Sequence, residues 1–413
     1  MNTHGLHQGS SVWLAGQRGR VSTAGTRSLP AVVAAQPSSA ARGVRTRRLP
    51  LAPFVPAARR TGGTPPSGRS RVWPKARIGG RPGPVRRRLS RARGLTAAPE
   101  GPDPVSPVNL IRRIEAGRGE FLLFALTPPQ LATDRERVQE IADTTIARLR
   151  PLGLDGLILY DIDDETERNP AERPFPFMPT LDPADYLGDH LGSWSTPVIV
   201  YRAVGKYAPE DLRAWLTVQD PARLMTVLVG AASSSAKVRT SLAVAQSLWR
   251  EANPTLTAGG VAIPERHSRR ADEHLRLLAK QDAGCRFFVT QVVYDINAAK
   301  DLVSDYHYEC KDRGIAQSPF VFTFSVCGSM KTLDFLRWLG VDVPRWIEND
   351  LKHAADPLEA SYQQALTTAT ELIAYCRTLG VPFGINVESV SIRRVEIEAA
   401  VRLAHQLRTQ LKP

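Results

Sequence analysis

The sequence predicts an α/β protein in which a single (β/α)8 TIM barrel follows a long, basic N-terminal segment. Strand-like and helix-like segments alternate eight times after about residue 109, which is the order expected of βα units. The strand-like segments lack the polar alternation of a half-exposed sheet, so both of their faces are expected to be buried. Residues 107–413 also have the length of one such barrel.

The N-terminal segment, residues 1–106, differs from the rest of the chain in charge and composition. It carries 19 Lys and Arg against 2 acidic residues, a net charge of +17. The whole chain carries +13, so residues 107–413 sum to −4. The segment is rich in Arg, Pro, Gly, Ser and Ala and has no helical or strand periodicity. Such a composition cannot bury enough apolar surface to offset its ordering entropy, and we expect disorder.

Three other interpretations of residues 1–106 stay open. Many Arg and Ser with few acids are typical of an organelle transit peptide, although the amphipathic helix of such a peptide is not evident. A polybasic arm is typical of nucleic-acid binding, although Trp13 and Trp73 are isolated and no folded module accompanies them. The third interpretation is a misassigned start, with the true one near residues 105–110. Composition does not separate these alternatives.

The elements of the predicted barrel follow in order along the chain. Helical apolar spacing predicts helices over 133–150 and 271–282, among others, with acidic residues near their starts. A doubly wound open sheet is the main alternative, but no GxGxxG opens a helix after a first strand. The short β-branched, aromatic or aliphatic runs predict strands at 121–126, 156–160, 197–201, 224–229, 259–263, 287–291, 319–324 and 382–387.

In a barrel of this kind the reactive groups lie where the strands end. The polar residues after the predicted strands therefore form the candidate site. They include several carboxylates, one histidine and two amides: Thr127, Asp161, Asp163, Asp164, Glu165, Arg202, Ser233, Glu265, His267, Gln291, Tyr294, Asp295, Ser325, Cys327, Asn386, Glu388 and Ser389.

Neither a disulfide framework nor a membrane span is predicted. The four cysteines are scattered without a CxxC pair, so reduced and mostly buried thiols are expected. No run of 18 apolar residues and no signal peptide is present. We expect a soluble, cytoplasmic protein without a membrane partner, and the charge of −4 argues against nucleic acid as the partner of the barrel.

Two motifs in residues 258–295 resemble the methylenetetrahydrofolate reductases. The first is Ile263-Pro-Glu-Arg-His-Ser268, which is similar to the family's Tyr-Pro-Glu-x-His-Pro. The second runs from Lys280 to Asp295 and contains Asp-Ala-Gly and Thr-Gln-Val-Val-Tyr-Asp, similar to the family's Asp-Ala-Gly and Thr-Gln-x-x-(Phe/Tyr)-Asp. The double proline Pro128-Pro129 and the segment 341–346 add weaker support. The conjunction in register is far more specific than any one motif.

The resemblance implies a folate enzyme and suggests roles for particular residues. Gln291 would read the edge of the pterin ring, with Tyr160, Tyr294 and Asp295 as further substrate-binding residues. By the same resemblance, His267 and Glu265 would contact the cofactor. Asp295 is also a suitable cap for the helix that follows it, and Glu265 could serve a helix start in the same way.

Three departures from the family concern its acid and its flavin. Ala125 stands where the family has the glutamate that protonates the folate nitrogen, and a methyl group cannot transfer a proton. The family's Arg-Gly-Asp after strand 4 is replaced by uncharged residues, and its Thr-Tyr-Gly after strand 2 by Leu159-Tyr-Asp161. We therefore expect that FAD is absent.

The cluster of acids after the second strand offers a replacement for the missing glutamate. Crowded carboxylates raise one another's pKa, so Asp161 or Asp163 could remain protonated near neutral pH and act as the catalytic acid. The alternative is a solvated loop in which these acids pair with Arg168 and Arg173. A divalent-metal site is a third interpretation, but no histidine accompanies the carboxylates, and we predict no metal.

These inferences together predict an oxidoreductase of one-carbon metabolism. It would reduce 5,10-methylenetetrahydrofolate to 5-methyltetrahydrofolate with NADH or NADPH, without flavin. Another folate-dependent reaction, such as methyl transfer or demethylation, and a non-catalytic folate-binding barrel are the alternatives. The apolar segment 174–178 is either a lid or a packing element. The partners expected are a folate and a nicotinamide, and a homo-oligomer stays open.

Overall fold

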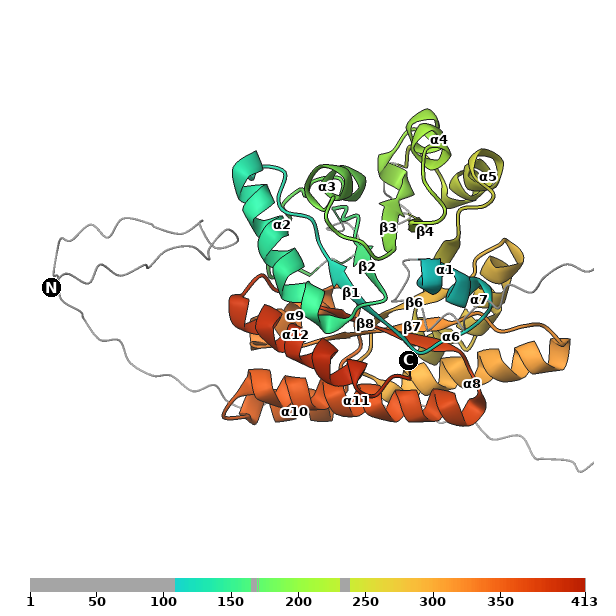
Figure 1. Ribbon diagram of the computed structural model, residues 1–413. Coiled ribbons are helices and arrows are strands. Elements are labelled where there is room, and N and C mark those ends of the chain that lie inside the picture. The colour runs from blue at the N-terminus through green and yellow to red at the C-terminus, as the bar shows by residue number, and fades with distance from the viewer. Residues whose placement is uncertain (1–107, 165–168, 170, 231–237, 413) are drawn as a thin grey trace, which may run out of the picture. The chain divides into compact units, whose positions relative to one another are not determined.

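Eight parallel strands close into a barrel in chain order, with helices around the outside (Figure 1). The computed structural model describes residues 108–164, 169, 171–230 and 238–412, so the predictions for residues 1–106 lie outside the described residues. The predicted (β/α)8 barrel is confirmed. Its strands are β1 (Phe121–Leu126), β2 (Gly156–Leu159), β3 (Val198–Ala203), β4 (Leu224–Val229), β5 (Ala258–Ala262), β6 (Phe288–Val292), β7 (Phe320–Ser325) and β8 (Phe383–Glu388).

All eight predicted strands are present. Two of them have the predicted ends, and the ends of the other six differ from the predicted ones by at most two residues. Three of the predicted strands began at a proline, at Pro197, Pro319 and Pro382, and each observed strand begins one residue later. Proline has no N–H to donate to a ladder, so it fits best just before a strand. The carbonyl of Pro197 still accepts a hydrogen bond from the Leu157 amide at 3.0 Å.

Helices follow the strands, and several begin at an aspartate that caps the helix. Asp134 accepts from the Arg137 amide and Asp356 from the Leu358 amide, which satisfies N–H groups that have no partner within the helix. The helices of the described residues are α1 (Val108–Glu115), α2 (Arg135–Leu149), α3 (Pro183–His190), α4 (Pro209–Thr217), α5 (Leu242–Ala252), α6 (Pro264–Arg270), α7 (Glu273–Asp282), α8 (Ile296–Arg313), α9 (Met330–Trp338), α10 (Arg345–His353), α11 (Pro357–Leu379) and α12 (Arg394–Arg408), with 3-10 turns η1 (Arg150–Leu152) and η3 (Val204–Lys206).

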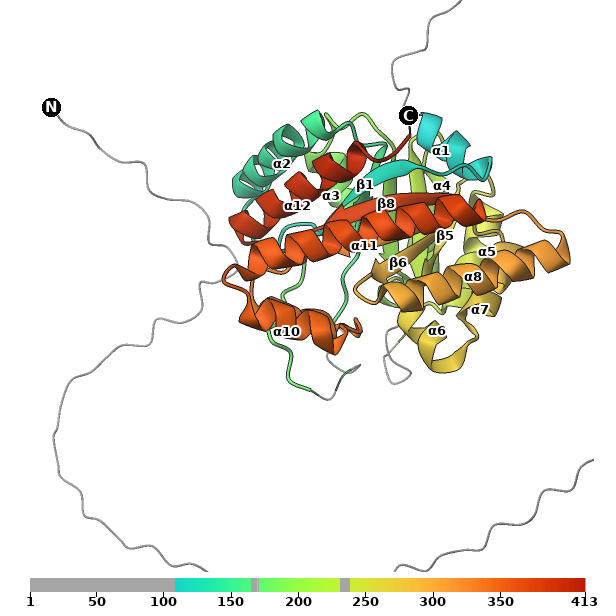
Figure 2. The ribbon, with the colours of Figure 1, turned by 90° about the horizontal axis from the view of Figure 1, so that it is seen from below.

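The strands are buried on both faces. Outward side chains such as Phe320 and Phe322 pack under the surrounding helices, while inward side chains such as Leu123, Ile199 and Val321 fill the barrel. On the outside, α11 and α12 lie side by side, and α12 packs against β1 and β8 (Figure 2). This double burial explains why the strands are continuous apolar runs.

Helix α1 closes the end of the barrel at which the strands begin. Its Leu110, Ile111 and Ile114 are almost completely buried and belong to the same cluster as Phe121 and Phe287 inside the barrel. The sequence did not predict this helix, which is only eight residues long. The chemistry is consequently confined to the opposite end, where the strands finish.

Two glycines make room for rings inside the barrel. A Cβ on Gly384 would lie 2.1 Å from the Phe121 ring, and one on Gly259 would lie 2.4 Å from the Phe287 ring. Any larger residue at these positions would displace the ring opposite. The two glycines therefore belong to the packing of the barrel interior.

The ladder between β4 and β5 is the shortest in the barrel. It pairs only Thr226 with Ala258 and Val227 with Gly259, whereas β3 and β4 pair over six residues. No further pairs between these two strands are present beyond Val227 and Gly259. Residues that follow in each strand, such as Leu228 and Gly260, line the larger cavity described below.

The four cysteines, Cys285, Cys310, Cys327 and Cys376, are free and buried, as predicted. Burial raises the pKa of the thiol in each, to about 11 in Cys285 and about 12 in Cys327 and Cys376. Among the described residues, no helix is both long enough and apolar enough to cross a membrane.

Candidate active site

A cavity of about 670 Å³ lies at the carboxyl ends of the strands. Its volume is in the range of sites that enclose a small organic ligand. Strands on several sides of the barrel and helices outside it contribute to its wall. The polar side chains of the lining are Tyr160, Tyr201, Gln246, Arg266, Arg276, Lys280, Thr290, Gln291, Thr323 and Glu388. Of the substrate-binding residues predicted from the sequence, Gln291 and Tyr160 line this cavity.

Glu388 and Tyr160 form the polar centre of the cavity wall. The Tyr160 hydroxyl donates to the Glu388 carboxylate over 2.5 Å, and the Asn386 amide donates to the Tyr160 oxygen at 3.3 Å. The same Asn386 amide donates to the Thr323 hydroxyl at 3.2 Å. Tyr160 also meets the ring of Tyr201 edge-on, with the ring centres 5.0 Å apart. These contacts fix the Glu388 side chain at the mouth of the barrel.

Glu388 is a carboxyl group that can hold a proton near neutral pH. Burial raises its pKa to about 7, although the hydrogen bond from Tyr160 acts in the opposite direction. Burial and the neighbouring Glu388 together raise the pKa of Tyr160 well above its ordinary value, so Tyr160 stays neutral and donates. Among the described residues lining the cavity, Glu388 is the one carboxyl group.

The position of Glu388 in the sheet relates it to the missing acid of the family. In the ladder between β1 and β8, Ala125 pairs with Glu388. Residues paired across a parallel ladder point the same way, so Glu388 faces inward beside the place where Ala125 has only a methyl group. The sequence placed Glu388 among the strand-end residues without assigning it a role. The signal that could have identified it is the inward alternation of Gly384, Asn386 and Glu388 along β8.

Gln291, the last residue but one of β6, lines the cavity, and one of its two polar groups is already engaged. Its amide nitrogen donates to the Leu339 carbonyl at 2.7 Å, which holds the side chain toward the loop after α9. Its amide oxygen is a further acceptor. The predicted role of Gln291 in binding the folate remains a prediction.

Tyr294 and Asp295, the other two residues predicted to bind the substrate, do not line the cavity. Tyr294 is buried in a cluster with Cys327 and Leu336, beside the cavity but outside its lining. Asp295 caps α8, where it accepts from the Asn297 amide at 2.9 Å and the Ala298 amide at 3.2 Å. The alternative interpretation of Asp295 as a helix cap is thus observed, and the substrate-binding roles of both residues remain predictions without support from the cavity.

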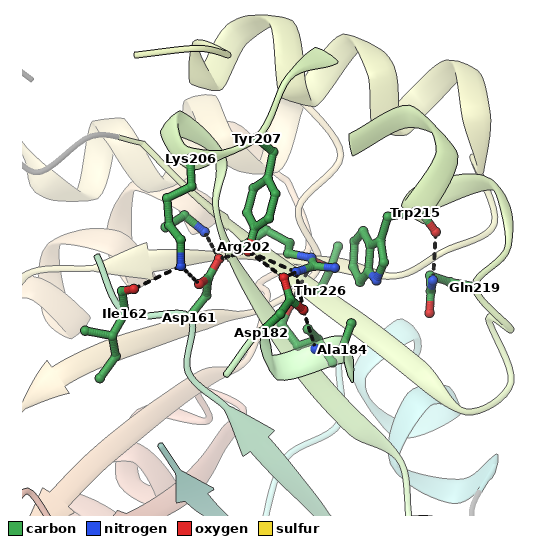
Figure 3. A network of polar contacts seen from close by, with 12 residues as sticks. Asp161, Ile162, Asp182, Ala184, Arg202, Lys206, Tyr207, Trp215, Gln219 and Thr226 are labelled. Carbon is green, nitrogen blue, oxygen red and sulfur yellow. Dashed lines mark hydrogen bonds and ion pairs between the residues drawn. The ribbon is translucent and has the colours of Figure 1, made fainter. Parts of the chain in front are cut away.

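Asp161 belongs to a network of ion pairs at the ends of β2 and β3 (Figure 3). Its side chain is almost fully buried and pairs with the Lys206 ammonium at 2.5 Å. It also accepts from the Tyr207 hydroxyl at 2.7 Å and from the Ala203 amide at 2.8 Å. With a cation and two neutral donors, Asp161 has the surroundings of a structural carboxylate.

The same network contains a second ion pair, between Arg202 and Asp182 (Figure 3). The guanidinium of Arg202 contacts both Asp182 oxygens, at 2.6 and 2.8 Å, and lies over the Trp215 ring with 4.1 Å to its centre. Burial alone would raise the pKa of Asp182, but Arg202 and the Ala184 amide hold it below its ordinary value. The network joins the loop after β2 to the end of β3.

Asp163 and Asp164 of the β2 loop are exposed to solvent. Asp163 accepts from the Asp164 amide at 2.9 Å and has no place in the cavity wall. Glu165 and Arg168 lie outside the described residues. The guanidinium of Arg173 is surrounded by the rings of Phe177, Phe335 and Trp338, at 5.0 to 5.3 Å. The cation observed opposite Asp161 is therefore Lys206.

The segment 174–178 packs against helix α9. The ring of Phe175 meets that of Phe335 edge-on, with centres 5.5 Å apart. Nearby, the Trp338 indole donates to the Ala171 carbonyl at 2.9 Å. Of the two interpretations of this segment, the structure shows packing against an outer helix.

Glu265 and His267 lie on α6, outside the lining of the cavity. Burial raises the pKa of Glu265 to about 7, and the ring of His267 is directed toward Asp305 on α8, at 3.1 Å. Their predicted contact with a cofactor therefore remains a prediction. Lys280, two turns along α7, does line the cavity, and burial lowers its pKa. No role was predicted for Lys280.

A second cavity, of about 350 Å³, lies between the end of β1 and helices α2 and α12. Its lining includes Pro128 and Pro129, the double proline after β1, and Arg148 of α2. Ser389 and Arg394 border it from the side of β8 and α12. The Thr133 hydroxyl at its wall has no hydrogen-bond partner in the described part of the chain.

Comparison with known proteins agrees with the motifs. The sequence profile of a family described as methylenetetrahydrofolate reductase matches residues 231–387. A search of curated proteins found no match. Among solved structures, an uncharacterized protein from Clostridium thermocellum that binds two copies of 5-methyl-5,6,7,8-tetrahydrofolic acid is 39% identical, with a TM-score of 0.65, over 73% of this chain and 99% of that chain.

Other solved structures are more distant. An EDTA monooxygenase from Chelativorans sp. is 11% identical with a TM-score of 0.42, over 72% of this chain and 95% of that one. A 2,3-dimethylmalate lyase is 13% identical with a TM-score of 0.37, over 68% and 78%. The profile match, together with 39% identity over almost the whole length of a folate-binding barrel, identifies the chain: it belongs to the methylenetetrahydrofolate reductase family.

Proposed function

We propose that this barrel binds a reduced folate in the larger cavity and reduces 5,10-methylenetetrahydrofolate to 5-methyltetrahydrofolate, with a reduced nicotinamide as hydride donor. The observation that carries the proposal is Glu388, a buried carboxyl group with a raised pKa beside Ala125. Family membership and the folate bound by the relative from Clostridium thermocellum support a folate as substrate.

Glu388 would supply the proton that the family's glutamate supplies and that Ala125, at the corresponding position, cannot. The methylene bridge of the substrate opens when its bond to one folate nitrogen breaks, and that nitrogen must gain a proton as the iminium forms. A carboxyl group with a pKa of about 7 is protonated in a large fraction of molecules near neutral pH. Tyr160 would hold the resulting carboxylate, since its hydroxyl already donates to Glu388.

The hydride would pass from the nicotinamide to the methylene carbon, so the folate is reduced and the nicotinamide oxidised. Glu388 then takes a proton from solvent, and one proton is consumed in each turnover. Gln291 would orient the pterin ring through its amide oxygen, because its nitrogen is held by Leu339. The loop after β4, on which the prediction about flavin depends, falls in residues 231–237, outside the described residues.

Asp161 and Asp163 are less suitable as the acid than Glu388. Asp161 is engaged in an ion pair with Lys206 and accepts from two further donors. Asp163 is exposed to solvent. Neither lines the cavity. We therefore assign the proton transfer to Glu388 in this proposal.

The test is an anaerobic assay of the purified chain with methylenetetrahydrofolate and NADH or NADPH, after its visible spectrum has been recorded for flavin. The wild-type protein should oxidise the nicotinamide without a flavin spectrum, and Glu388→Gln should lower kcat by about 100-fold or more, the usual contribution of a positioned acid. Folate binding by Glu388→Gln should persist.

The matched control is Glu396→Gln. Glu396 is also a buried glutamate with a raised pKa, but it lies on α12 and pairs with Arg393, away from the cavity. Its replacement should leave kcat per folded molecule near that of the wild type. Equal activity of the Glu388→Gln and wild-type proteins would exclude Glu388 as the acid.

A non-reductive role in binding 5-methyltetrahydrofolate is the second candidate, because the relative from Clostridium thermocellum binds two copies of that molecule. Described residues also line the cavities of about 670 and 350 Å³ near the ends of the strands. Isothermal titration with 5-methyltetrahydrofolate separates the two functions when combined with the assay. Tight binding of two equivalents without any nicotinamide oxidation would favour the binding role.

A further inference from the structure

His267 belongs to the Pro-Glu-x-His motif and, like Glu265, lies outside the lining of the larger cavity. It is almost fully buried on α6, with 3% of its surface exposed. Its Nε2 lies 3.1 Å from a carboxylate oxygen of Asp305 on α8. The ring of His274, at the start of α7, meets that of His267 edge-on, with the centres 5.3 Å apart. Two imidazoles and a carboxylate from three helices thus converge outside the cavity.

The spacing of these three side chains suits a metal ion. One ligand atom from each of His267, His274 and Asp305 lies within 4.8 Å of the other two. Ligands in a tetrahedral zinc site are about 3.3 Å apart, given metal–ligand bonds of about 2.0–2.1 Å. The His267–Asp305 pair is already at this separation, and the half-exposed side chains of His274 and Asp305 can turn toward the centre.

The hydrogen bonding of the two histidines is incomplete without a further partner. In the described part of the chain, the Nδ1 atoms of both His267 and His274 are buried and have no hydrogen-bond partner. A buried ring nitrogen without a partner is costly, since it has lost its water. In such a site His267 would bind the cation through Nε2, the nitrogen beside Asp305, and His274 would bind it through Nδ1, which would give that nitrogen the electron-pair acceptor that it lacks.

The backbone between the two histidines is held in an uncommon conformation. Ala271 has φ +52°, in the left-handed region, which is unfavourable for a residue with a Cβ. This turn ends α6 and sets the direction of α7, so it determines that His274 faces His267. Both helices pack against α8, which carries Asp305, and the three lie together in Figure 1.

The surrounding charges permit a cation. Arg266 is paired with the buried Glu273 at 2.8 Å, and Arg269 is paired with Asp342 at 3.4 Å. A carboxylate therefore offsets part of the positive charge of each arginine near the cluster. Asp301 stands one helical turn before Asp305 and adds negative charge to the same face of α8. Two imidazoles and one carboxylate form a donor set that favours zinc. Magnesium and calcium are less suitable, because they take oxygen ligands.

We propose that His267, His274 and Asp305 bind a zinc ion that fastens the α6–α7 turn to α8. Three protein ligands leave a fourth position for water. The site is separate from the folate cavity, so this proposal does not depend on the proposed reaction.

The experiment measures zinc in the full chain, prepared without a tag and dialysed, and follows Co²⁺ substitution by its visible absorption. We expect one zinc per chain. His274→Gln and Asp305→Asn should each weaken zinc binding at least 10-fold, the usual order for loss of a group that supports a metal. Added zinc should raise the Tm of the wild-type protein and leave that of both variants unchanged, because an ion stabilises only the state that binds it.

Two controls make the outcome decisive. His353→Gln removes an exposed histidine at the end of α10 and should bind zinc like the wild type. A His4→Gln/His7→Gln variant removes the histidines of the N-terminal segment and should do the same. The proposal is overturned if the wild-type chain retains no zinc, or if His274→Gln and Asp305→Asn bind as tightly as the wild type while folding normally by circular dichroism.

Discussion

Glu388 and Asp161 are both inaccessible carboxyl groups at strand ends, but their neighbours give them opposite properties. Glu388 has a neutral partner, Tyr160, and burial raises its pKa to about 7. Asp161 has a cation, Lys206, and two further donors. The sequence shows both acids next to strands and cannot show these partners, because Tyr160 and Glu388 are 228 residues apart. Only the closure of the barrel brings them together.

Replacement of Tyr160 by phenylalanine should shift the pH dependence of turnover upward. The hydrogen bond from Tyr160 stabilises the charged form of Glu388 and lowers its pKa, so its loss raises that pKa further above 7. Activity that requires protonated Glu388 is present below this pKa and is lost as the pH rises through it. The falling limb of kcat should therefore move to higher pH in Tyr160→Phe. The measurement is kcat between about pH 5 and pH 9, and a shift to lower pH would contradict the assignment.

Replacement of Asp161 by asparagine should reduce stability more than catalysis. Asparagine keeps an acceptor for the Ala203 amide but leaves the Lys206 ammonium without its counter-charge. We expect a loss of about 1–3 kcal/mol in the free energy of unfolding, with kcat per folded molecule near the wild-type value. Urea unfolding and steady-state assays measure the two effects. Asp163→Asn, at an exposed position, is the control and should change neither; a 100-fold loss of kcat in Asp161→Asn at unchanged stability would restore Asp161 as the acid.

At the scale of the elements, much of the fold could be predicted from the sequence. The eight strands are continuous apolar runs bounded by proline or polar residues, and this local signal suffices to find them. Helix α1 was missed because eight residues carry little periodic signal. The short ladder between β4 and β5 and the pairing of Ala125 with Glu388 were also missed. They depend on register between strands, which no single segment encodes.

Gly384→Ala tests the packing of β8 against β1. The added methyl group would lie within 2.6 Å of three atoms of the Phe121 ring, which must then move. Overpacking of this kind costs about 1–3 kcal/mol, measured as the free energy of unfolding in urea. A Phe121→Leu background, with a smaller side chain, should reduce the cost. Gly188→Ala on α3, where nothing lies within 4 Å, should be neutral or stabilising; equal effects at the two glycines would argue against this packing.

At the scale of the molecule, the charge of the chain is divided unevenly. Residues 1–106 carry +17, whereas residues 107–413 sum to −4. The core that the structure describes is formed by residues from Leu110 onward, with α1 at one end and the cavity at the other. Every residue proposed to bind folate or zinc lies in the part of the chain that the structure describes.

Two truncations test where the folding unit begins. Removal of residues 1–106 should leave the Tm and folate binding unchanged, because α1 is retained. Removal of residues 1–117 takes away Leu110, Ile111 and Ile114, each buried by at least 96%. Burial of one such side chain contributes about 1.5–3 kcal/mol, so this longer truncation should lower the Tm sharply. Differential scanning calorimetry measures both, and a lower Tm after the shorter truncation would show that the basic segment contributes to stability.

The buried thiols allow local opening of the barrel to be measured by the rate at which they are alkylated. Only a thiolate reacts readily with an alkylating reagent, and Cys285, Cys327 and Cys376 have a pKa of about 11 to 12 in positions that reagents do not reach. Labelling at mildly alkaline pH then requires local opening of the structure. The labelling rate of each cysteine therefore reports how often its region opens. Cys285 lies between α7 and β6, Cys327 between β7 and α9, and Cys376 on α11. Mass spectrometry of the labelled peptides would therefore give a separate opening rate for each of these three regions of the barrel.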